Sequence, residues 1–324
     1  MTVVVTGAAG FIGSYVAQAL TARGERVVGI DNMNAYYDVS LKEARLARLR
    51  ALPGFAFHQI DIADRRALSD VLEKLENVSG VIHLAAQAGV RYSLEAPHEY
   101  VHSNVMGQVS VFEAVRRLDP MPRLVYASSS SVYGRNKKVP FSINDPVDHP
   151  VSLYAATKRG GELLAESYSA MYGMASTGLR FFTVYGPWGR PDMAYFSFTK
   201  AIIEGKPIRV FNNGDLERDF TYIDDIVAGV LASLDRTPDA AHPHRLYNLG
   251  NNKPVPVMEF IRTIERAIGK KAEMKMEPMQ PGDVKVTAAD IEESRRDLGF
   301  VPKTGIDEGI PRFVAWYREH YGAR

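Results

Sequence analysis

The 324-residue sequence contains no cysteine. This absence excludes disulfide bonds, thiolate nucleophiles and metal sites built on thiolates, and we expect no bound metal. The chain also lacks an apolar run of about 20 residues, which is the length that a membrane-spanning helix needs. Its first residues, MTVVVTGAAGFIG, lack the basic segment that opens a signal peptide. These absences predict a cytoplasmic protein without a membrane partner.

An excess of charge of either sign is missing as well. Lys and Arg total 39 against 38 Asp and Glu, which gives a formal net charge of +1. A chain without a basic excess is not expected to bind nucleic acid, and any anion that it binds must be held by local groups. The hydrophobic fraction of 46% and the charged fraction of 24% are ordinary for a globular protein.

The first 180 residues alternate short β-branched runs with longer helical stretches. Strands are predicted at 3–5, 27–30, 55–60, 81–84, 124–127 and 177–181, and helices at 10–21, 41–49, 65–75, 101–118 and 153–172. Such alternation is typical of βαβ units with right-handed crossovers. The predicted fold class is therefore α/β, with a doubly wound, Rossmann-like parallel sheet.

The pattern changes after Phe182, where the segment TVYGPWGRPDM is rich in turn residues. Beyond it, isolated strands are predicted at 208–211, 246–249 and 272–276, with helices at 196–204, 257–268 and 306–321. We therefore expect a cofactor-binding domain over 1–182 and a smaller α/β lobe over 183–324. A segment at about 220–250, which includes a helical stretch at 224–234, is expected to return to the first domain.

A glycine-rich turn follows the first predicted strand and opens the first helix. Its glycines, Gly7, Gly10 and Gly13, suit a tight turn, a close approach of backbone to a pyrophosphate, and close packing of the helix. Asp31 ends the second strand, where a carboxylate can accept hydrogen bonds from an adenosine ribose and would repel a 2′-phosphate. The turn therefore predicts a dinucleotide site that prefers NAD to NADP. Asp61 and Ile62, at the end of the third strand, are expected to meet the adenine edge.

Tyr154 and Lys158 are four residues apart on one face of the helix predicted from 153. A lysine ammonium beside a phenol favours the phenolate, so this pair predicts a tyrosine that acts as a general base. Tyr133 and Lys137 have the same spacing, but Gly134 lies between them in a polar loop. We therefore expect the second pair not to share a helix face.

The serine run 128–131 follows the fifth predicted strand. Ligands of doubly wound folds bind beyond the carboxyl ends of the strands, which is where these hydroxyls are expected to lie. Serines also cap strand exits without any function. The Tyr154–Lys158 pair on the next helix favours a functional role for the run.

The glycine spacing and these motifs resemble the extended short-chain dehydrogenase/reductase family. Over nearly its whole length the chain is similar to the sugar-nucleotide 4-epimerases of that family, and most similar to the branch that acts on UDP-glucuronate. The resemblance rests on the segments TGAAGFIG, DNMNAYYD, HLAAQAGVRYS, YASSSSVYG, YAATKRGGE, LRFFTVYGPWGRPDMA, RDFTYIDDI and QPGDV.

This resemblance implies tightly held NAD, a UDP-sugar bound between two lobes, and a homodimer packed through the helices at about 101–117 and 153–172. It implies that Ser129 relays a proton between the sugar hydroxyl and Tyr154, and that Phe182 lies near the nicotinamide. The remaining cofactor contacts that it implies are Gly7, Gly10, Phe11, Ile12, Gly13, Asp31, Asn32, Asp61, Ile62, Leu84, Ala85, Ala86, Gln87, Asn104, Tyr154 and Lys158.

The resemblance also implies a set of substrate contacts. Arg218 matches an arginine near the nucleotide diphosphate, although a surface ion pair with Asp215 or Asp219 is the alternative. Related UDP-galactose epimerases carry a further arginine just before the Gly-Asp of the late motif, where this chain has Gln280. The expected substrate contacts are Arg91, Ser129, Ser130, Ser131, Tyr154, Thr183, Arg190, Arg218 and Asp283.

Several reactions share the oxidation of C4, and the sequence discriminates among them. A 4,6-dehydratase of this family carries Asp-Glu after its catalytic Thr, where this chain has Ser130 and Ser131. The segments AGVRYS and RFFTVYGPWGRPDM resemble the uronate epimerase branch, which predicts conversion of UDP-glucuronate to UDP-galacturonate through a 4-keto intermediate. A UDP-glucuronate decarboxylase, an epimerase of a neutral UDP-hexose and a non-catalytic NAD-binding regulator are the alternatives.

An epimerase of a uronate must also prevent the loss of CO2 from the 4-keto acid. This requires hydrogen-bond donors that hold the carboxylate near the carbonyl plane. The hydroxyls of 129–131 and Thr183 follow neighbouring strands and are placed for this role, with Arg190 as a charged partner. A capping role for Thr183 and a solvent-exposed Arg190 are the alternative.

Overall fold

The computed structural model describes residues 1–236, 238, 240–280 and 284–323. Its centre is a parallel seven-stranded sheet with the order β10-β6-β5-β4-β1-β2-β3. The strands are β1 (Thr2–Thr6), β2 (Arg26–Asp31), β3 (Phe55–Gln59), β4 (Val78–His83), β5 (Arg123–Ser129), β6 (Ser176–Phe181) and β10 (His244–Leu249). The predicted doubly wound fold is confirmed.

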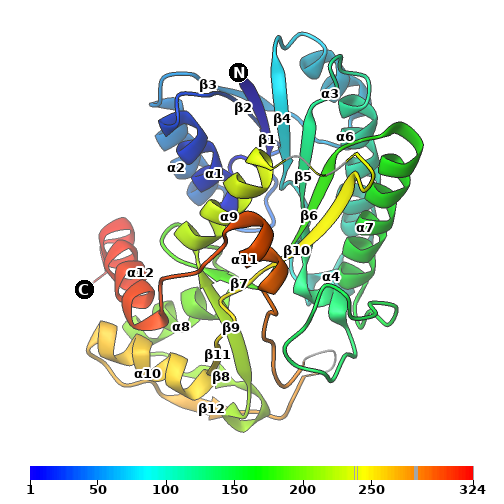
Figure 1. Ribbon diagram of the computed structural model, residues 1–324. Helices are drawn as coiled ribbons and strands as arrows, with labels where there is room; N and C mark the ends of the chain where they lie inside the picture. Colours follow the sequence, from blue (N-terminus) through cyan, green and yellow to red (C-terminus); the bar gives the residue numbers. More distant parts are fainter. Residues whose placement is uncertain (237, 239, 281–283, 324) are drawn as a thin grey trace.

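Helices cover both faces of this sheet (Figure 1). One face carries α1 (Phe11–Ala22), α2 (Val39–Arg50) and α9 (Ile223–Asp235); the other carries α3 (Arg65–Leu72), α6 (Gly107–Val115) and α7 (Leu153–Tyr172). Alternate side chains of β1 enter the two cores, since Val3 and Val5 pack with the first group and Val4 with the second. Because β1 is buried on both faces, its sequence is a continuous apolar run rather than an alternation of apolar and polar residues.

The late segment that was expected to return to this sheet contributes α9 and β10. Helix α9 packs against α1, and β10 pairs with β6 at the edge of the sheet. Ile226 and Val230 of α9 and Tyr247 and Leu249 of β10 are buried in the same core, and this burial explains why the chain comes back.

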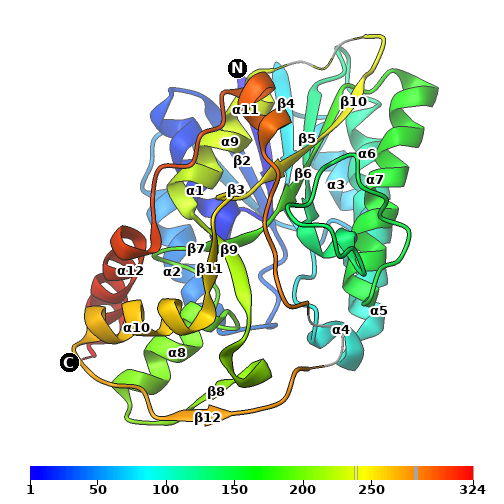
Figure 2. The ribbon, with the colours of Figure 1, turned by 60° about the horizontal axis from the view of Figure 1, so that its bottom comes forward.

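A smaller lobe lies beyond the carboxyl ends of the strands (Figures 1 and 2). Its sheets are short: β11-β9-β7 and β12-β8. Its elements are β7 (Thr183–Tyr185), α8 (Ala194–Ile203), β8 (Ile208–Val210), η3 (Phe211–Gly214), β9 (Glu217–Tyr222), β11 (Pro254–Pro256), α10 (Val257–Ile268), β12 (Met274–Met276) and α12 (Ile306–Tyr321). Helix α11 (Glu292–Leu298) instead packs against β10 and α9 of the central sheet domain. Strands β7, β9 and β11 and helix α11 were not anticipated from the sequence.

The helix predicted at 101–118 differs from the one observed. The chain forms the short helices α4 (Tyr92–Glu95) and α5 (Pro97–Tyr100), then a π-helical turn η1 (Val101–Met106), and only then α6, which ends at Val115. Among the described helices, none is both long and apolar enough to cross a membrane.

Candidate active site

A cavity of about 810 Å³ lies between the strand ends and the smaller lobe. The glycine turn borders one end, and residues of η3 and the strands of the small lobe border the other. The predicted site residues that line it are Gly7, Gly10, Phe11, Ile12, Gly13, Asp31, Asn32, Ile62, Leu84, Ala85, Ala86, Gln87, Arg91, Ser129, Ser130, Ser131, Tyr154, Lys158, Phe182, Thr183, Arg190 and Arg218.

The glycine turn is too crowded for side chains. Gly7 has a φ of +71°, and a Cβ on it would lie 2.7 Å from the backbone nitrogen of Ala85. A Cβ on Gly13 would lie 2.0 Å from the carbonyl oxygen of Gly7, so the first turn of α1 packs directly on the loop. The first N–H groups of a helix have no acceptor within the helix. A bare loop that leads into such a helix end fits the pyrophosphate of a dinucleotide.

Asp31 is buried beside this turn. Its carboxylate accepts hydrogen bonds from the backbone nitrogens of Ala9 (3.1 Å) and Met33 (2.8 Å). A carboxylate has about four acceptor positions, so capacity remains for ribose hydroxyls. Together the glycine turn and Asp31 fit NAD.

Two of the predicted cofactor residues, Asp61 and Asn104, do not line the cavity. The Asp61 carboxylate accepts a hydrogen bond from the side-chain nitrogen of Asn32 (3.0 Å). The Asn104 side chain accepts one from the backbone nitrogen of Gln87 (2.8 Å) and donates one to its carbonyl oxygen (3.0 Å). In the structure these two residues therefore hold Asn32 and Gln87, which do line the cavity.

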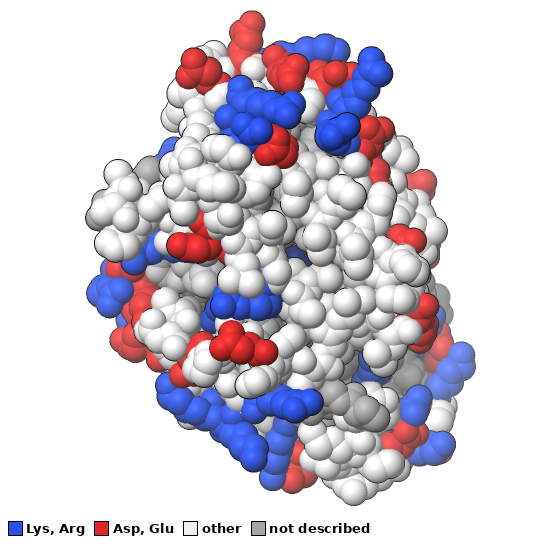
Figure 3. All heavy atoms as spheres, turned by 90° about the vertical axis from the view of Figure 1, so that its right-hand side faces the viewer, with Lys and Arg blue, Asp and Glu red and all other residues white. Residues whose placement is uncertain are grey.

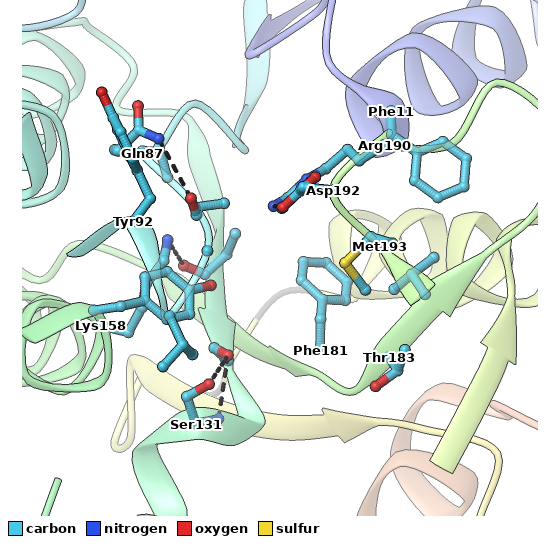
Figure 4. A pocket seen from close by; sticks show the side chains of 18 of the residues that line it. Phe11, Gln87, Tyr92, Ser131, Lys158, Phe181, Thr183, Arg190, Asp192 and Met193 are labelled. Atoms are coloured by element: carbon cyan, nitrogen blue, oxygen red, sulfur yellow. Dashed lines mark hydrogen bonds and ion pairs between the residues drawn. The ribbon is translucent and has the colours of Figure 1, made fainter. Parts of the chain in front are cut away.

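Tyr154 and Lys158 project from α7 into the cavity, as Figure 4 shows for Lys158. The Lys158 ammonium donates a hydrogen bond to the carbonyl oxygen of Ala127 (2.9 Å), at the end of β5. Burial lowers the pKa of Lys158 to about 8. Burial also raises the pKa of Tyr154, although a hydrogen bond with the Ser129 hydroxyl opposes the rise. The predicted lowering of the pKa of Tyr154 by Lys158 is thus not present in the protein alone, because burial dominates.

Tyr133 and Lys137, which have the same spacing as Tyr154 and Lys158, do not lie on one helix, as predicted. Tyr133 ends the 3₁₀ helix η2 (Ser130–Tyr133), and Gly134 follows it with a φ of +53°. The Tyr133 hydroxyl donates a hydrogen bond to the side-chain oxygen of Asn248 (2.6 Å). Tyr133 and Lys137 therefore do not share a helix face.

Hydroxyl groups and one guanidinium face each other across the cavity (Figure 4). The Ser129 hydroxyl donates to that of Ser131 (3.2 Å) at the start of η2. Thr183 begins β7 on the opposite side, and Arg190 follows in the loop after β7.

Arg190 has two partners that the sequence analysis did not single out. Its Nε and one Nη donate to the Asp192 carboxylate (3.0 and 2.5 Å), which also accepts a hydrogen bond from the Tyr36 hydroxyl (3.2 Å). Burial and the positive charge of Arg190 act in opposite directions on the pKa of Asp192, and the result is a lowered pKa. The Arg-Pro-Asp spacing in the loop is the sequence signal that could have indicated the ion pair. No comparable signal links Tyr36 to it.

The far end of the cavity carries further arginines. The guanidinium groups of Arg91 and Arg209 each lie about 5 Å from the centre of the Phe211 ring. Arg218 donates to the carbonyl oxygens of Glu217 (2.8 Å) and Lys285 (3.1 Å), and Asp215 pairs with Lys285. Asp283, a predicted substrate contact, lies outside the described residues.

The sequence also holds two histidine pairs with metal-ligand spacing, His98–His102 and His242–His244, which the expectation of no metal overlooked. His102 lies 3.4 Å from the Asp61 carboxylate, and His244 contacts Glu166 and Tyr126. Within the described part of the chain, no group of three or more acidic or imidazole side chains is placed to hold a metal ion.

Comparisons with known proteins agree with this geometry. Residues 3–250 match the NAD dependent epimerase/dehydratase family. UDP-glucuronate 4-epimerase 4 of Arabidopsis thaliana is 50% identical, over 99% of this chain and 76% of that protein. An uncharacterised 37.6 kDa protein of Escherichia coli O111:H- is 51% identical, over 99% of each chain.

Solved structures extend the likeness to the whole fold. The UDP-glucuronic acid 4-epimerase of Bacillus cereus, in complex with UDP-glucuronic acid and NAD, superposes with a TM-score of 0.92 at 34% identity, covering 99% of this chain and 100% of that one. The UDP-glucose 4-epimerase of Thermotoga maritima, with UDP-glucose, has a TM-score of 0.88 at 27% identity, covering 99% and 100%.

Proposed function

Because the chain belongs to the NAD dependent epimerase/dehydratase family, we propose that it is an NAD-dependent enzyme that interconverts UDP-glucuronate and UDP-galacturonate by inverting C4 of the sugar. The observation that carries this proposal is the meeting of Tyr154, Lys158 and Ser129 in one cavity with the glycine turn. Two comparisons support the choice of sugar. They are the 50% identical UDP-glucuronate 4-epimerase 4 of Arabidopsis thaliana and the similar Bacillus cereus structure with UDP-glucuronic acid.

NAD, when bound along Gly7–Gly13 and Asp31, supplies the group that accepts and returns the hydride of C4. The residues of this chain move the proton. Ser129, which bonds with Tyr154, takes the proton of the 4-hydroxyl and passes its own proton to the Tyr154 phenolate. Lys158 favours the ionised phenol through its positive charge. After the 4-keto sugar turns over and C4 is reduced on its other face, the same two hydroxyl groups return the proton to the C4 oxygen.

The groups around the sugar carboxylate determine whether CO2 is lost. Ser130, Ser131, Thr183 and Arg190 all line the cavity, and Figure 4 shows Thr183 and Arg190 on the side opposite Ser131. We assign these hydroxyls to the carboxylate, and Arg190 to the carboxylate or the diphosphate. Held near the plane of the C4 carbonyl, the carboxylate cannot align its bond to C5 for decarboxylation. Arg91 and Arg218 are assigned to the diphosphate end of the ligand.

We also propose a division of the chain into two functional parts. Residues 1–182, together with about 220–250, form the NAD-binding domain, and the rest of 183–324 forms the UDP-sugar lobe. We propose that the enzyme works in the cytoplasm; its chain has no cysteine and therefore needs no disulfide bond for stability.

We further propose a homodimer. Exposed apolar side chains lie on η1 and α7, namely Val101, Met106, Leu163, Met171 and Tyr172. Figure 3 shows that charged side chains are sparse in the middle of this side of the molecule and gather at its ends. An apolar face of this kind fits a second copy of the chain, packed helix against helix.

One experiment tests the proposal directly. Purified protein is incubated with UDP-glucuronate without added NAD, and the products are resolved by chromatography and NMR. We expect UDP-galacturonate to form without net consumption of cofactor. Release of a UDP-pentose as the main product would instead identify a decarboxylase, and an unchanged sugar nucleotide would indicate a binding protein.

A further inference from the structure

Helix α7 presents four polar residues at intervals of four: Tyr154, Lys158, Glu162 and Glu166. The first three each contact one residue at the carboxyl end of β5. Tyr154 bonds with Ser129, Lys158 donates to the carbonyl oxygen of Ala127 (2.9 Å), and Glu162 accepts from the Ser128 hydroxyl (2.6 Å). The sequence analysis assigned roles to Tyr154 and Lys158 and none to Glu162.

Glu162 is a charged residue whose side chain is 0% exposed. Its carboxylate accepts hydrogen bonds from Nε and one Nη of Arg180 on β6 (2.8 and 2.9 Å) and from Arg159 (3.1 Å). Lys158 adds a third cation one helical turn away. A buried charge is stable only when opposite charges lie beside it. The Glu162 carboxylate is the negative charge that balances these three cations.

We propose that Glu162 is a positioning residue for proton transfer, which keeps the Lys158 ammonium charged and holds the end of β5 so that Ser129 meets Tyr154. This inference rests on the proposed role of Tyr154 as the base. Glu162 does not line the cavity, so it acts through Lys158 and Ser128 rather than on the sugar.

The surroundings of Lys158 make its charge sensitive to Glu162. Burial lowers the pKa of Lys158 to about 8, and the negative charge of Glu162 opposes that effect. His83 on β4 faces Lys158 and supplies no compensating charge, since burial lowers its pKa to about 3. Two effects act on the pKa of Glu162: burial raises it, and the hydrogen bonds and charge of Arg180 lower it. The second effect is larger, so the pKa is below its ordinary value and the carboxylate stays ionised. The other titratable groups that interact with Glu162 are Tyr126, Tyr133, Arg159 and His244.

The test is the pH dependence of epimerisation in Glu162→Gln. The amide keeps the shape of the side chain but leaves Lys158 beside an uncompensated Arg180. Lys158 should then lose its proton at lower pH, so the alkaline limb of the kcat/KM profile should move toward acid by about one unit or more. Glu166→Gln is the matched control, since Glu166 lies one turn further along α7, is 67% exposed and pairs with His244. Its profile should match that of the wild type.

A second variant covers the case in which a lone buried Arg180 prevents folding. The double variant Glu162→Gln/Arg180→Met removes both buried charges together, which proteins tolerate better than the loss of one partner. Its alkaline limb should still lie below that of the wild type, because Lys158 has lost its nearby anion. Profiles of the folded variants that coincide with the wild type would overturn the proposal, even if the turnover itself were lower.

A titration without substrate separates this inference from the proposed function. The tyrosinate absorbance of each protein is followed against pH, and that of its Tyr154→Phe partner is subtracted, which leaves the ionisation of one phenol. We expect Tyr154 to ionise at higher pH in Glu162→Gln than in the wild type, because Lys158 is less charged. A shift in a protein that does not epimerise UDP-glucuronate would support the role of Glu162 and contradict the reaction. Epimerisation of UDP-glucuronate without a shift in the ionisation of Tyr154 would support the reaction and contradict the role of Glu162.

Discussion

Tyr154 is the residue whose replacement tests the proton transfer most directly. Tyr154→Phe keeps the ring, which packs edge-on against Tyr100, and removes the hydroxyl. We expect turnover of UDP-glucuronate to fall ~10²–10⁴-fold or more, the range for loss of a general base. Steady-state kinetics on protein with a verified content of NAD provide the measurement.

Tyr133→Phe is the control for this variant. Its hydroxyl bonds to Asn248, away from Tyr154, so its loss should lower the free energy of unfolding by about 1 kcal/mol and leave the chemistry in place. If Tyr133→Phe were the inactive protein and Tyr154→Phe the active one, the assignment of the base would be wrong.

Asp31 is predicted to determine the preference for NAD over NADP. Asp31→Ala should bind NAD more weakly and discriminate less against NADP, because the charge that repels a 2′-phosphate is gone. The alanine also loses the hydrogen bonds from Ala9 and Met33, so Asp31→Asn is the companion that removes charge while keeping an acceptor. Calorimetric titration of both nucleotides measures the effect. An unchanged preference in both variants would refute the ribose assignment.

Thr183 and Ser130 test how the carboxylate is held. One hydrogen bond to a charged group contributes ~1.5–3 kcal/mol, enough to change partitioning by about 10–100-fold. Thr183→Ala or Ser130→Ala should therefore epimerise more slowly and release CO2 and UDP-4-keto-pentose, leaving reduced cofactor behind. Trapped CO2 and product chromatography are the readouts, with Tyr154→Phe as the control that cannot form the keto acid. Slower turnover without CO2 from either variant would remove these hydroxyls from the carboxylate site.

At the scale of elements, two neighbouring glycines in α7 are predicted to respond in opposite ways to alanine. A Cβ on Gly160 has nothing within 4 Å, whereas one on Gly161 would lie 2.5 Å from the buried amide of Gln108 on α6. Gly160→Ala should raise the free energy of unfolding by about 0.5–1 kcal/mol, because alanine favours a helix.

Gly161→Ala should lower the free energy of unfolding by about 1–3 kcal/mol. The added methyl forces α6 and α7 apart and disturbs the hydrogen bond from Gln108 to the Gly161 carbonyl (2.9 Å). Urea unfolding of the two variants side by side measures both effects. Equal changes would show that helix propensity, rather than the close approach of α6 and α7, controls stability at these positions.

At the scale of the whole molecule, the proposed homodimer would form through the apolar face of η1 and α7. Leu163→Glu places a charge in the middle of that face and should convert the dimer to a monomer, as measured by light scattering after size exclusion against a chain mass of 35.9 kDa. Val301→Glu changes an equally exposed apolar residue, between α11 and α12, and should leave the dimer intact. A wild-type protein that is monomeric would contradict the assembly.

Local patterns were sufficient for most of the nucleotide-binding half. The apolar runs of β1, β2 and β4, the turn Gly7–Gly13 and the helical spacing of Tyr154 and Lys158 are signals within a few residues of each other. Such signals are readable because backbone geometry and helix periodicity act over the same short range. The small lobe was harder, and β9 was missed, because a short strand is stabilised by partners far away in sequence, here β7 and β11.

Only the tertiary structure decided which polar and charged side chains pair with one another. Tyr36 meets Asp192, and Glu162 meets Arg180 and Ser128, across separations of up to 156 residues. No spacing rule links such groups, because the sheet order and the loops bring them together. The same burial raises the pKa of Tyr154, which the spacing of Tyr154 and Lys158 alone predicted to fall. The residue types and local spacing therefore determined the chemistry available to this protein, and the packing of strands β5 and β6 against α7 determined its electrostatics, because desolvation depends on all the neighbours of a group at once.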